Sequence, residues 1–98
     1  MQTINTLIVE DSEDNREALK TLLGEECPEV HLVGEAETVY EAHELIEAQD
    51  PELVFLDIQL KDHTSFDLLE RLMQEGGIDF EIVFVTAYGK FEYATKAI

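Results

Sequence analysis

Short, mostly apolar runs alternate along the chain with longer segments in which apolar residues recur every three or four positions. The apolar runs cover residues 6–9, 30–34, 53–56 and 82–85. Runs of this length are typical of buried strands, whereas the spacing in the longer segments is typical of amphipathic helices. Strands that are apolar throughout belong in parallel sheets covered on both faces. The alternation therefore predicts an α/β fold with a doubly wound parallel sheet.

Three helices are predicted between these strands. The first begins at Asp14, which with Glu17 has the spacing of a capping box, and it is ended by Gly24. The second begins at Thr38 and ends before Pro51, because proline disfavours helical backbone in the residue before it. The predicted apolar faces are Leu19, Leu22 and Leu23 in the first helix, Ala42, Leu45 and Ile46 in the second, and Leu69, Leu72 and Met73 in the third.

The chain is long enough for one domain, which we assign to residues 1–98. Residues 90–98 have the pattern of the start of a fourth helix, and the sequence stops there. One more strand and helix would need roughly 20–25 residues. We therefore expect the domain to be incomplete at its C-terminal end, and its exposed sheet edge to favour self-association.

Composition narrows the class of function. The chain has 23 acidic and 6 basic residues and a net charge of −17, so contact with nucleic acid is not expected. The single cysteine, Cys27, excludes an internal disulfide and fits a reducing cytoplasm. No stretch approaches the ~18 apolar residues of a membrane span, and no secretory signal is recognised, so a cytoplasmic location is predicted. The histidines, His31, His43 and His63, have no metal-ligand spacing.

Chemically competent side chains follow three of the four predicted strands. Glu10 and Asp11 come after the first strand, Asp57 after the third and Thr86 after the fourth. Because the carboxyl ends of parallel strands meet at one sheet edge, where ligands bind, we expect the acids to converge. At about 4 Å and an effective dielectric near 20, each ionised pair repels by roughly 4 kcal/mol. Either one carboxyl group is protonated or a cation lies among them.

Hard oxygen ligands that leave positions for water and phosphate oxygens are typical of a Mg²⁺ site. A carboxylate beside Mg²⁺ is also a nucleophile toward phosphorus, which points to Asp57 as a phosphoryl acceptor. The hydroxyl of Thr86 would donate to a phosphoryl oxygen. Singly, an acid after a strand is more often a turn or capping residue, and a threonine there is usually a strand former. The prediction therefore rests on the occurrence of such residues after three of the four predicted strands.

Residues 8–12, 54–60 and 83–88 resemble, in order and spacing, the three signature segments of response regulator receiver domains. The resemblance implies a flavodoxin-like sheet with strand order 2-1-3-4, from which the family's fifth strand and helix are missing. The amino-acid sequences of the second and third segments are similar to those of receivers attached to LytTR-type DNA-binding domains. That similarity implies a C-terminal output domain outside this sequence.

The resemblance also assigns roles. It implies that Asp57 takes a phosphoryl group from a sensor histidine kinase and that Thr86 is the switch hydroxyl. Mg²⁺ would be bound by the carboxylates of Asp11 and Asp57, by the backbone carbonyl of Gln59 and, through water, by Glu10. Such a protein is a signalling phosphoacceptor rather than an enzyme, and it catalyses only its own phosphorylation and dephosphorylation.

The chain departs from the family pattern in two ways. Lys61 and Ser65 stand where the family usually has proline and glycine. We favour ordinary loop variation, and the alternative is that Lys61 leans toward the acids and weakens their need for metal. The lysine and switching aromatic of the family's fifth strand have no counterpart here, so the chain is expected to bind Mg²⁺ but to phosphorylate or switch poorly.

Two other functions are considered. The altered loop and the missing strand leave open a receiver-like interaction module that does not use phosphate. An aspartyl-phosphate phosphatase of the haloacid dehalogenase type ranks last. Those enzymes typically have Asp-x-Asp after the first strand, whereas the segment from Asp57 to Gln59 lacks the second acid and follows the third strand.

Overall fold

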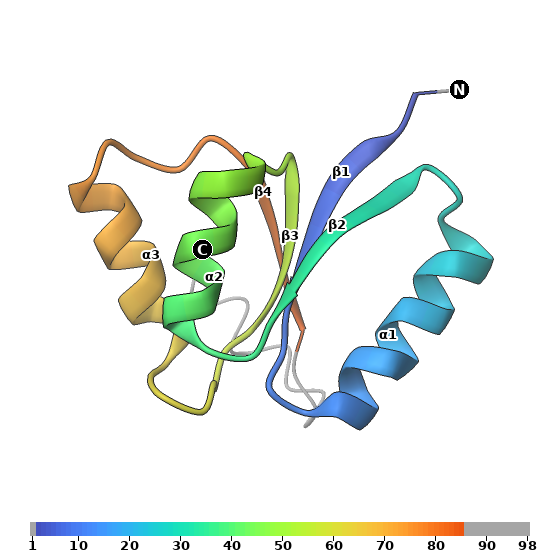
Figure 1. Ribbon diagram of the computed structural model, residues 1–98, viewed down its shortest axis with the longest axis horizontal. Helices are drawn as coiled ribbons and strands as arrows, with labels where there is room; N and C mark the ends of the chain where they lie inside the picture. Colours follow the sequence, from blue (N-terminus) through green and yellow to red (C-terminus); the bar gives the residue numbers. More distant parts are fainter. Residues whose placement is uncertain (1, 86–98) are drawn as a thin grey trace.

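A computed structural model describes residues 2–85 as a parallel sheet with helices on both faces (Figure 1). Thr86 and the predicted helix that starts at residue 90 lie outside the described residues. In chain order the elements are β1 (Ile4–Val9), α1 (Glu13–Glu26), β2 (Val30–Ala36), α2 (Val39–Gln49), β3 (Leu53–Asp57), α3 (Ser65–Gln74) and β4 (Glu81–Val85). None of the helices within residues 2–85 is long and apolar enough to cross a membrane.

The described strands form one sheet in the order β2-β1-β3-β4, and every neighbouring pair is parallel. This confirms both the doubly wound α/β fold and the order 2-1-3-4. Val9, the last residue of β1, pairs with Leu56 of β3. The next residue of β3, Asp57, pairs with Val85 at the end of β4. The strand ends that carry the predicted chemistry are therefore neighbours.

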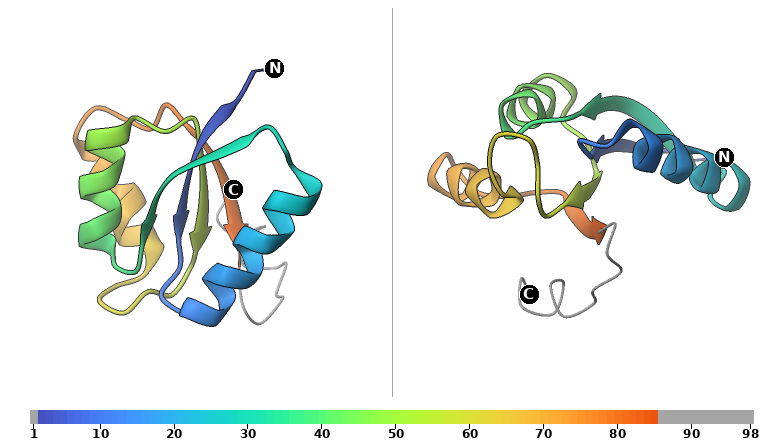
Figure 2. Two further views of the ribbon diagram at one scale, coloured as in Figure 1. Left: turned by 45° about the vertical axis from the view of Figure 1, so that its right-hand side comes forward. Right: turned by 90° about the horizontal axis from the view of Figure 1, so that it is seen from below.

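Helices α2 and α3 lie together on one face of the sheet, and α1 lies on the other face (Figures 1 and 2). The strand side chains Leu7, Ile8, Val54 and Leu56 are fully buried because they belong to the central strands β1 and β3, which are covered on both sides. The core between the sheet and the pair of α2 and α3 consists of Leu7, Val9, Ala36, Val39, Ala42, Val54, Leu56, Leu60, Leu68 and Leu72.

Side-chain caps fix where the first two helices begin. Ser12 is the N-cap of α1 and its side chain accepts a hydrogen bond from the backbone nitrogen of Asn15. The capping box predicted at Asp14 was therefore wrong, and α1 also continues past Gly24 to Glu26. For α2 the prediction is confirmed, because the side chain of Thr38 accepts from the backbone nitrogen of Glu41, 3.0 Å away. This helix ends as predicted before Pro51, at a left-handed Asp50 with φ of 46°.

The apolar helix faces were predicted correctly in part. In α2, Ala42 is buried, and Leu45 and Ile46 pack against the core as predicted. Leu22 and Met73, however, are 54% and 63% exposed. In α3, Leu72 is buried and Leu69 packs against the core as predicted, whereas Leu68, which was not predicted, is fully buried. Several apolar residues follow one another in these helices, so spacing alone did not decide which of them face the sheet.

The difference between Leu68 and Met73 gives a test of the packing. Leu68 is fully buried, so Leu68→Ala should lower the free energy of unfolding by about 2–5 kcal/mol through lost contacts and a cavity. Met73→Ala, on the same helix but exposed, should change it by no more than about 0.5 kcal/mol. Urea unfolding followed by circular dichroism measures both. Equal effects of the two substitutions would contradict this placement of α3.

Candidate functional site

Three acidic side chains from two adjacent strands meet at the carboxyl edge of the sheet. Glu10 and Asp11 directly follow β1, and Asp57 is the last residue of β3. Each can place one carboxylate oxygen within 4.8 Å of the others. Glu10 and Asp57 are only 4% and 8% exposed, and Asp11 is half-buried. The structure thus brings together the three acids that the sequence placed at the strand ends.

Three hydrogen bonds hold Glu10 in place. Its backbone nitrogen donates to the carbonyl of Ala36 at the end of β2, over 2.9 Å. Its own carbonyl accepts a hydrogen bond of 2.9 Å from Nη1 of Arg16 in α1. Its carboxylate Oε2 accepts from the backbone nitrogen of Ser12, again over 2.9 Å. Glu10 is therefore fixed in the acid cluster through both its backbone and its side chain.

Burial and like charge shift the titration of the two buried acids. The pKa of Glu10 is raised from its ordinary 4.5 to about 7, mainly by burial and also by the nearby Asp57 carboxylate, against the opposing hydrogen bond from Ser12. Burial also raises the pKa of Asp57, while hydrogen bonds from Glu10 and from the backbone of Gln59 and Ile58 favour its charged form. Without a cation, Glu10 therefore holds a proton that it shares with Asp57 near neutral pH.

The loop after Asp57 folds back on the strand end. The Ser65 hydroxyl donates to the backbone carbonyl of Asp57, and the Ser65 nitrogen donates to the Ile58 carbonyl over 2.7 Å. Gln59 forms an isolated antiparallel bridge with Thr64. Ser65 is the first residue of α3, and its φ is not positive. Serine at this position therefore causes no backbone strain, and its hydroxyl instead holds the acceptor strand in place.

Lys61 is paired away from the three acids. Its Nζ lies 2.9 Å from Oε1 of Glu37, whose other carboxylate oxygen lies 3.2 Å from Nη1 of Arg16. Asp11 contributes only a weaker charge interaction, which together with the main effect of Glu37 raises the pKa of Lys61. The structure thus favours loop variation over the alternative that Lys61 leans into the acid cluster.

Asp62 connects this loop to α2, a contact that the sequence did not reveal. Its Oδ1 accepts a hydrogen bond of 2.9 Å from the backbone nitrogen of Val39, and its Oδ2 accepts one of 3.4 Å from Tyr40. Asp62 thereby caps the first turn of α2 beside Thr38. It is 23 residues from Val39, so no local spacing could have signalled the contact.

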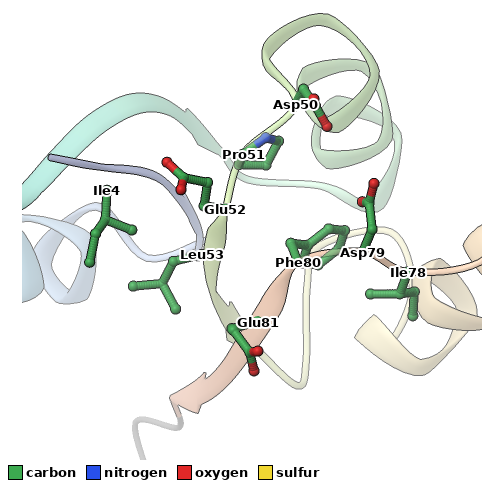
Figure 3. Close-up of a pocket in the computed structure, with 9 residues that line it drawn as sticks. All are labelled: Ile4, Asp50, Pro51, Glu52, Leu53, Ile78, Asp79, Phe80 and Glu81. Carbon is green, nitrogen blue, oxygen red and sulfur yellow. The ribbon is translucent and has the colours of Figure 1, made fainter. Parts of the chain in front are cut away.

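A hollow of about 740 Å³ lies at the opposite edge of the sheet, where β1, β3 and β4 begin (Figure 3). None of the three converging acids lines it, so it is separate from the strand-end site. Its lining residues are Ile4, Asp50, Pro51, Glu52, Leu53, Ile78, Asp79, Phe80 and Glu81.

Comparison with known proteins agrees with this arrangement. A family model described as "Response regulator receiver domain" matches residues 6–98. "Sensory transduction protein LytT" of Enterococcus faecalis is 43% identical over 94 residues, which cover 96% of this chain and 37% of that protein. A protein of the same name from Bacillus anthracis is 39% identical over 94 residues, with the same coverage of both chains. The chain thus spans little more than a third of the length of these relatives.

Solved structures share the fold. A two-component response regulator of the LuxR family from an Aurantimonas species superposes with a TM-score of 0.82 at 26% identity, covering 98% of this chain and 67% of that one. The MaeR response regulator bound to beryllium trifluoride gives a TM-score of 0.78 at 26% identity, covering 97% of this chain and 76% of that one.

The shared proton predicts a pH dependence of stability. The pKa of Glu10 in the folded chain is about 7, above its ordinary 4.5, so the folded state binds more protons than the unfolded state between these values. Without metal, the stability that this proton supplies is complete below about pH 4.5 and is lost as the pH rises through 7. The loss should be on the order of 1–2 kcal/mol after allowance for solvent screening.

Urea unfolding between pH 5 and 8 with a chelator measures this loss, and Glu10→Gln is the control because glutamine cannot titrate. The difference in unfolding free energy between the chain and Glu10→Gln should change in favour of the variant as the pH rises. A difference independent of pH would contradict the shared proton.

Proposed function

The chain belongs to the response regulator receiver family, and from that premise we propose that Asp57 accepts a phosphoryl group beside a Mg²⁺ ion. The observation that carries the proposal is the convergence of Glu10, Asp11 and Asp57 within 4.8 Å, with two of these acids buried. Two buried carboxyl groups and a third half-buried one form an all-oxygen donor set, which fits Mg²⁺.

Four residues would bind the Mg²⁺ ion. Asp11 and Asp57 would bind the ion through their carboxylates, Gln59 through its backbone carbonyl and Glu10 through a water molecule. When bound, Mg²⁺ neutralises charge on the phosphoryl oxygens. Glu10 has to release the proton that it shares with Asp57 before the pocket carries its full negative charge toward the ion.

The chemistry at Asp57 is nucleophilic. A carboxylate oxygen of Asp57 forms a bond to phosphorus while the bond from phosphorus to the donor breaks, and the electron pair leaves with the donor. Backbone groups of Ile58 and Gln59 favour the ionised, nucleophilic form of Asp57. The Ser65 hydroxyl holds the carbonyl of Asp57, which limits movement of the acceptor. Thr86, which follows the last residue of β4, would donate a hydrogen bond to a phosphoryl oxygen.

The phosphoryl donor is proposed to be the phosphohistidine of a sensor histidine kinase in the cytoplasm. Because the chain spans about a third of the LytT relatives, the signal would pass to an output region beyond this sequence. On this proposal the protein is a signalling phosphoacceptor that catalyses only reactions of its own aspartate. Beryllium trifluoride, which the MaeR response regulator binds, would bind at Asp57 in place of the phosphoryl group.

Intact-mass measurement after incubation with acetyl phosphate tests the proposal. The chain should gain the mass of one phosphoryl group when Mg²⁺ is present, and neither the Asp57→Asn variant nor a sample with chelator should gain it. Asparagine keeps the size of the side chain and removes the nucleophile, so it is a matched control.

A gain that persists in Asp57→Asn would place the modification elsewhere and contradict the assignment. If the chain gains no mass, a longer version that includes a fifth strand decides the matter. Phosphorylation of the longer chain would show that the added residues supply a needed group. Its failure as well would favour the interaction module that does not use phosphate.

A further inference from the structure

A second group of metal-ligating side chains lies between α2 and α3, which pack side by side on one face of the sheet (Figure 1). His43 and Glu47 are one turn apart on α2, and Glu75 is the C-cap of α3. Each offers one ligand atom, and these atoms lie within 4.8 Å of one another. The group does not involve the acids at the strand ends.

One nitrogen of the His43 imidazole, Nε2, lies close to two carboxylates. This atom lies 2.6 Å from Oε1 of Glu75 and 3.5 Å from Oε1 of Glu47. A neutral ring nitrogen can donate only one hydrogen, so it satisfies Glu75 and leaves Glu47 without a hydrogen bond from the ring. The His43 side chain is only 15% exposed, which keeps Nε2 directed at this group.

The third ligand is fixed independently of His43. The backbone nitrogen of Glu75 donates to the carbonyls of Arg71 and Leu72, both at 3.1 Å. Its Oε2 lies 3.5 Å from Nε of Arg71, which turns the other oxygen, Oε1, toward His43. Hydrogen bonds that orient a ligand in this way are typical of the surroundings of metal sites.

We propose that His43, Glu47 and Glu75 form a site for a divalent transition-metal ion of the Zn²⁺ class, which bridges α2 and α3. One imidazole nitrogen and two carboxylate oxygens are ligands that Zn²⁺ accepts at about 2.0–2.2 Å, with water in the fourth position. Ligand atoms around such a tetrahedral ion are roughly 3.3 Å apart. The 3.5 Å pair already has this spacing, and the 2.6 Å pair needs to open by less than about 1 Å.

The mixed nitrogen and oxygen donor set separates this site from the strand-end pocket. Mg²⁺ prefers the all-oxygen pocket, whereas imidazole favours Zn²⁺ and related ions. The sequence places His43 and Glu47 four residues apart, but Glu75 is 32 residues from His43, and the packing of α3 against α2 brings it to this pair. A bound ion would connect the two helices that begin next to the loop after Asp57, where Asp62 caps α2 and Ser65 opens α3.

Calorimetric titration with ZnCl₂ in excess Mg²⁺ tests the proposal independently of phosphorylation. The chain should bind one Zn²⁺, and its thermal unfolding midpoint should rise as the ion stabilises the folded state. His43→Gln and Glu75→Gln should each weaken binding by about tenfold or more. Glu47→Gln should weaken it too, and this residue is exposed enough to change without loss of the fold.

His63→Gln is the matched control. The Nδ1 atom of His63 lies 3.6 Å from Oδ2 of Asp67 at the same i,i+4 spacing, but this pair belongs to no group of three ligating side chains within residues 2–85. The variant should bind Zn²⁺ as the unaltered chain does. Binding that is unchanged in both His43→Gln and Glu47→Gln, or lost in Asp57→Asn, would overturn the proposal and leave the group as an ion pair only.

Discussion

Repulsion between two buried carboxyl groups, Glu10 and Asp57, is the constraint that the rest of the site has to satisfy. The strand order places β1 beside β3, and both strands end in acids, so the fold itself forces these groups together. Neither can turn fully to water, because both are more than nine-tenths buried. The charge is offset either by a proton, which Glu10 holds with a pKa of about 7, or by a cation among the carboxylates. Because this pKa lies near neutral pH, the proton is only partly bound there, and a cation that enters the cluster can displace it.

The loop after Asp57 is held mainly by buried and backbone contacts. The family usually has proline where this chain has Lys61, and the Lys61 ion pair with Glu37 replaces some of the lost restraint. That pair is exposed and screened by solvent, so its contribution is small. The bonds from Asp62 to the first turn of α2 and from Ser65 to the carbonyl of Asp57 restrain the loop more strongly. A side-chain cap of a helix is typically worth about 1 kcal/mol, and the Ser65 hydroxyl is fully buried. The acceptor Asp57 thus lies at the end of β3, and the loop that follows it is held by the hydrogen bonds of Asp62 and Ser65.

Much of this arrangement could be predicted from the sequence, because the strands are short apolar runs and the acids follow them directly. The convergence of Glu10 and Asp57 required only that parallel strands share one carboxyl edge. Contacts between residues that are distant in sequence could not be predicted. The clearest examples are the hydrogen bond from the backbone of α2 to Asp62 and the contact between Glu75 and His43. The helix faces were ambiguous where apolar residues are adjacent, as in α3. The role of Thr86 stays a prediction, since it lies outside the described residues.

The exchange of a proton for a metal ion is the central claim, and proton release on Mg²⁺ binding tests it most directly. Mg²⁺ would be titrated into the metal-free chain in weakly buffered solution at pH 6, below the pKa of Glu10, with a pH indicator present. The account predicts that each bound Mg²⁺ releases most of one proton, and that Glu10→Gln binds the ion without this release. Binding of Mg²⁺ to the unaltered chain with no proton released would show that Glu10 does not hold the shared proton, and would contradict the account.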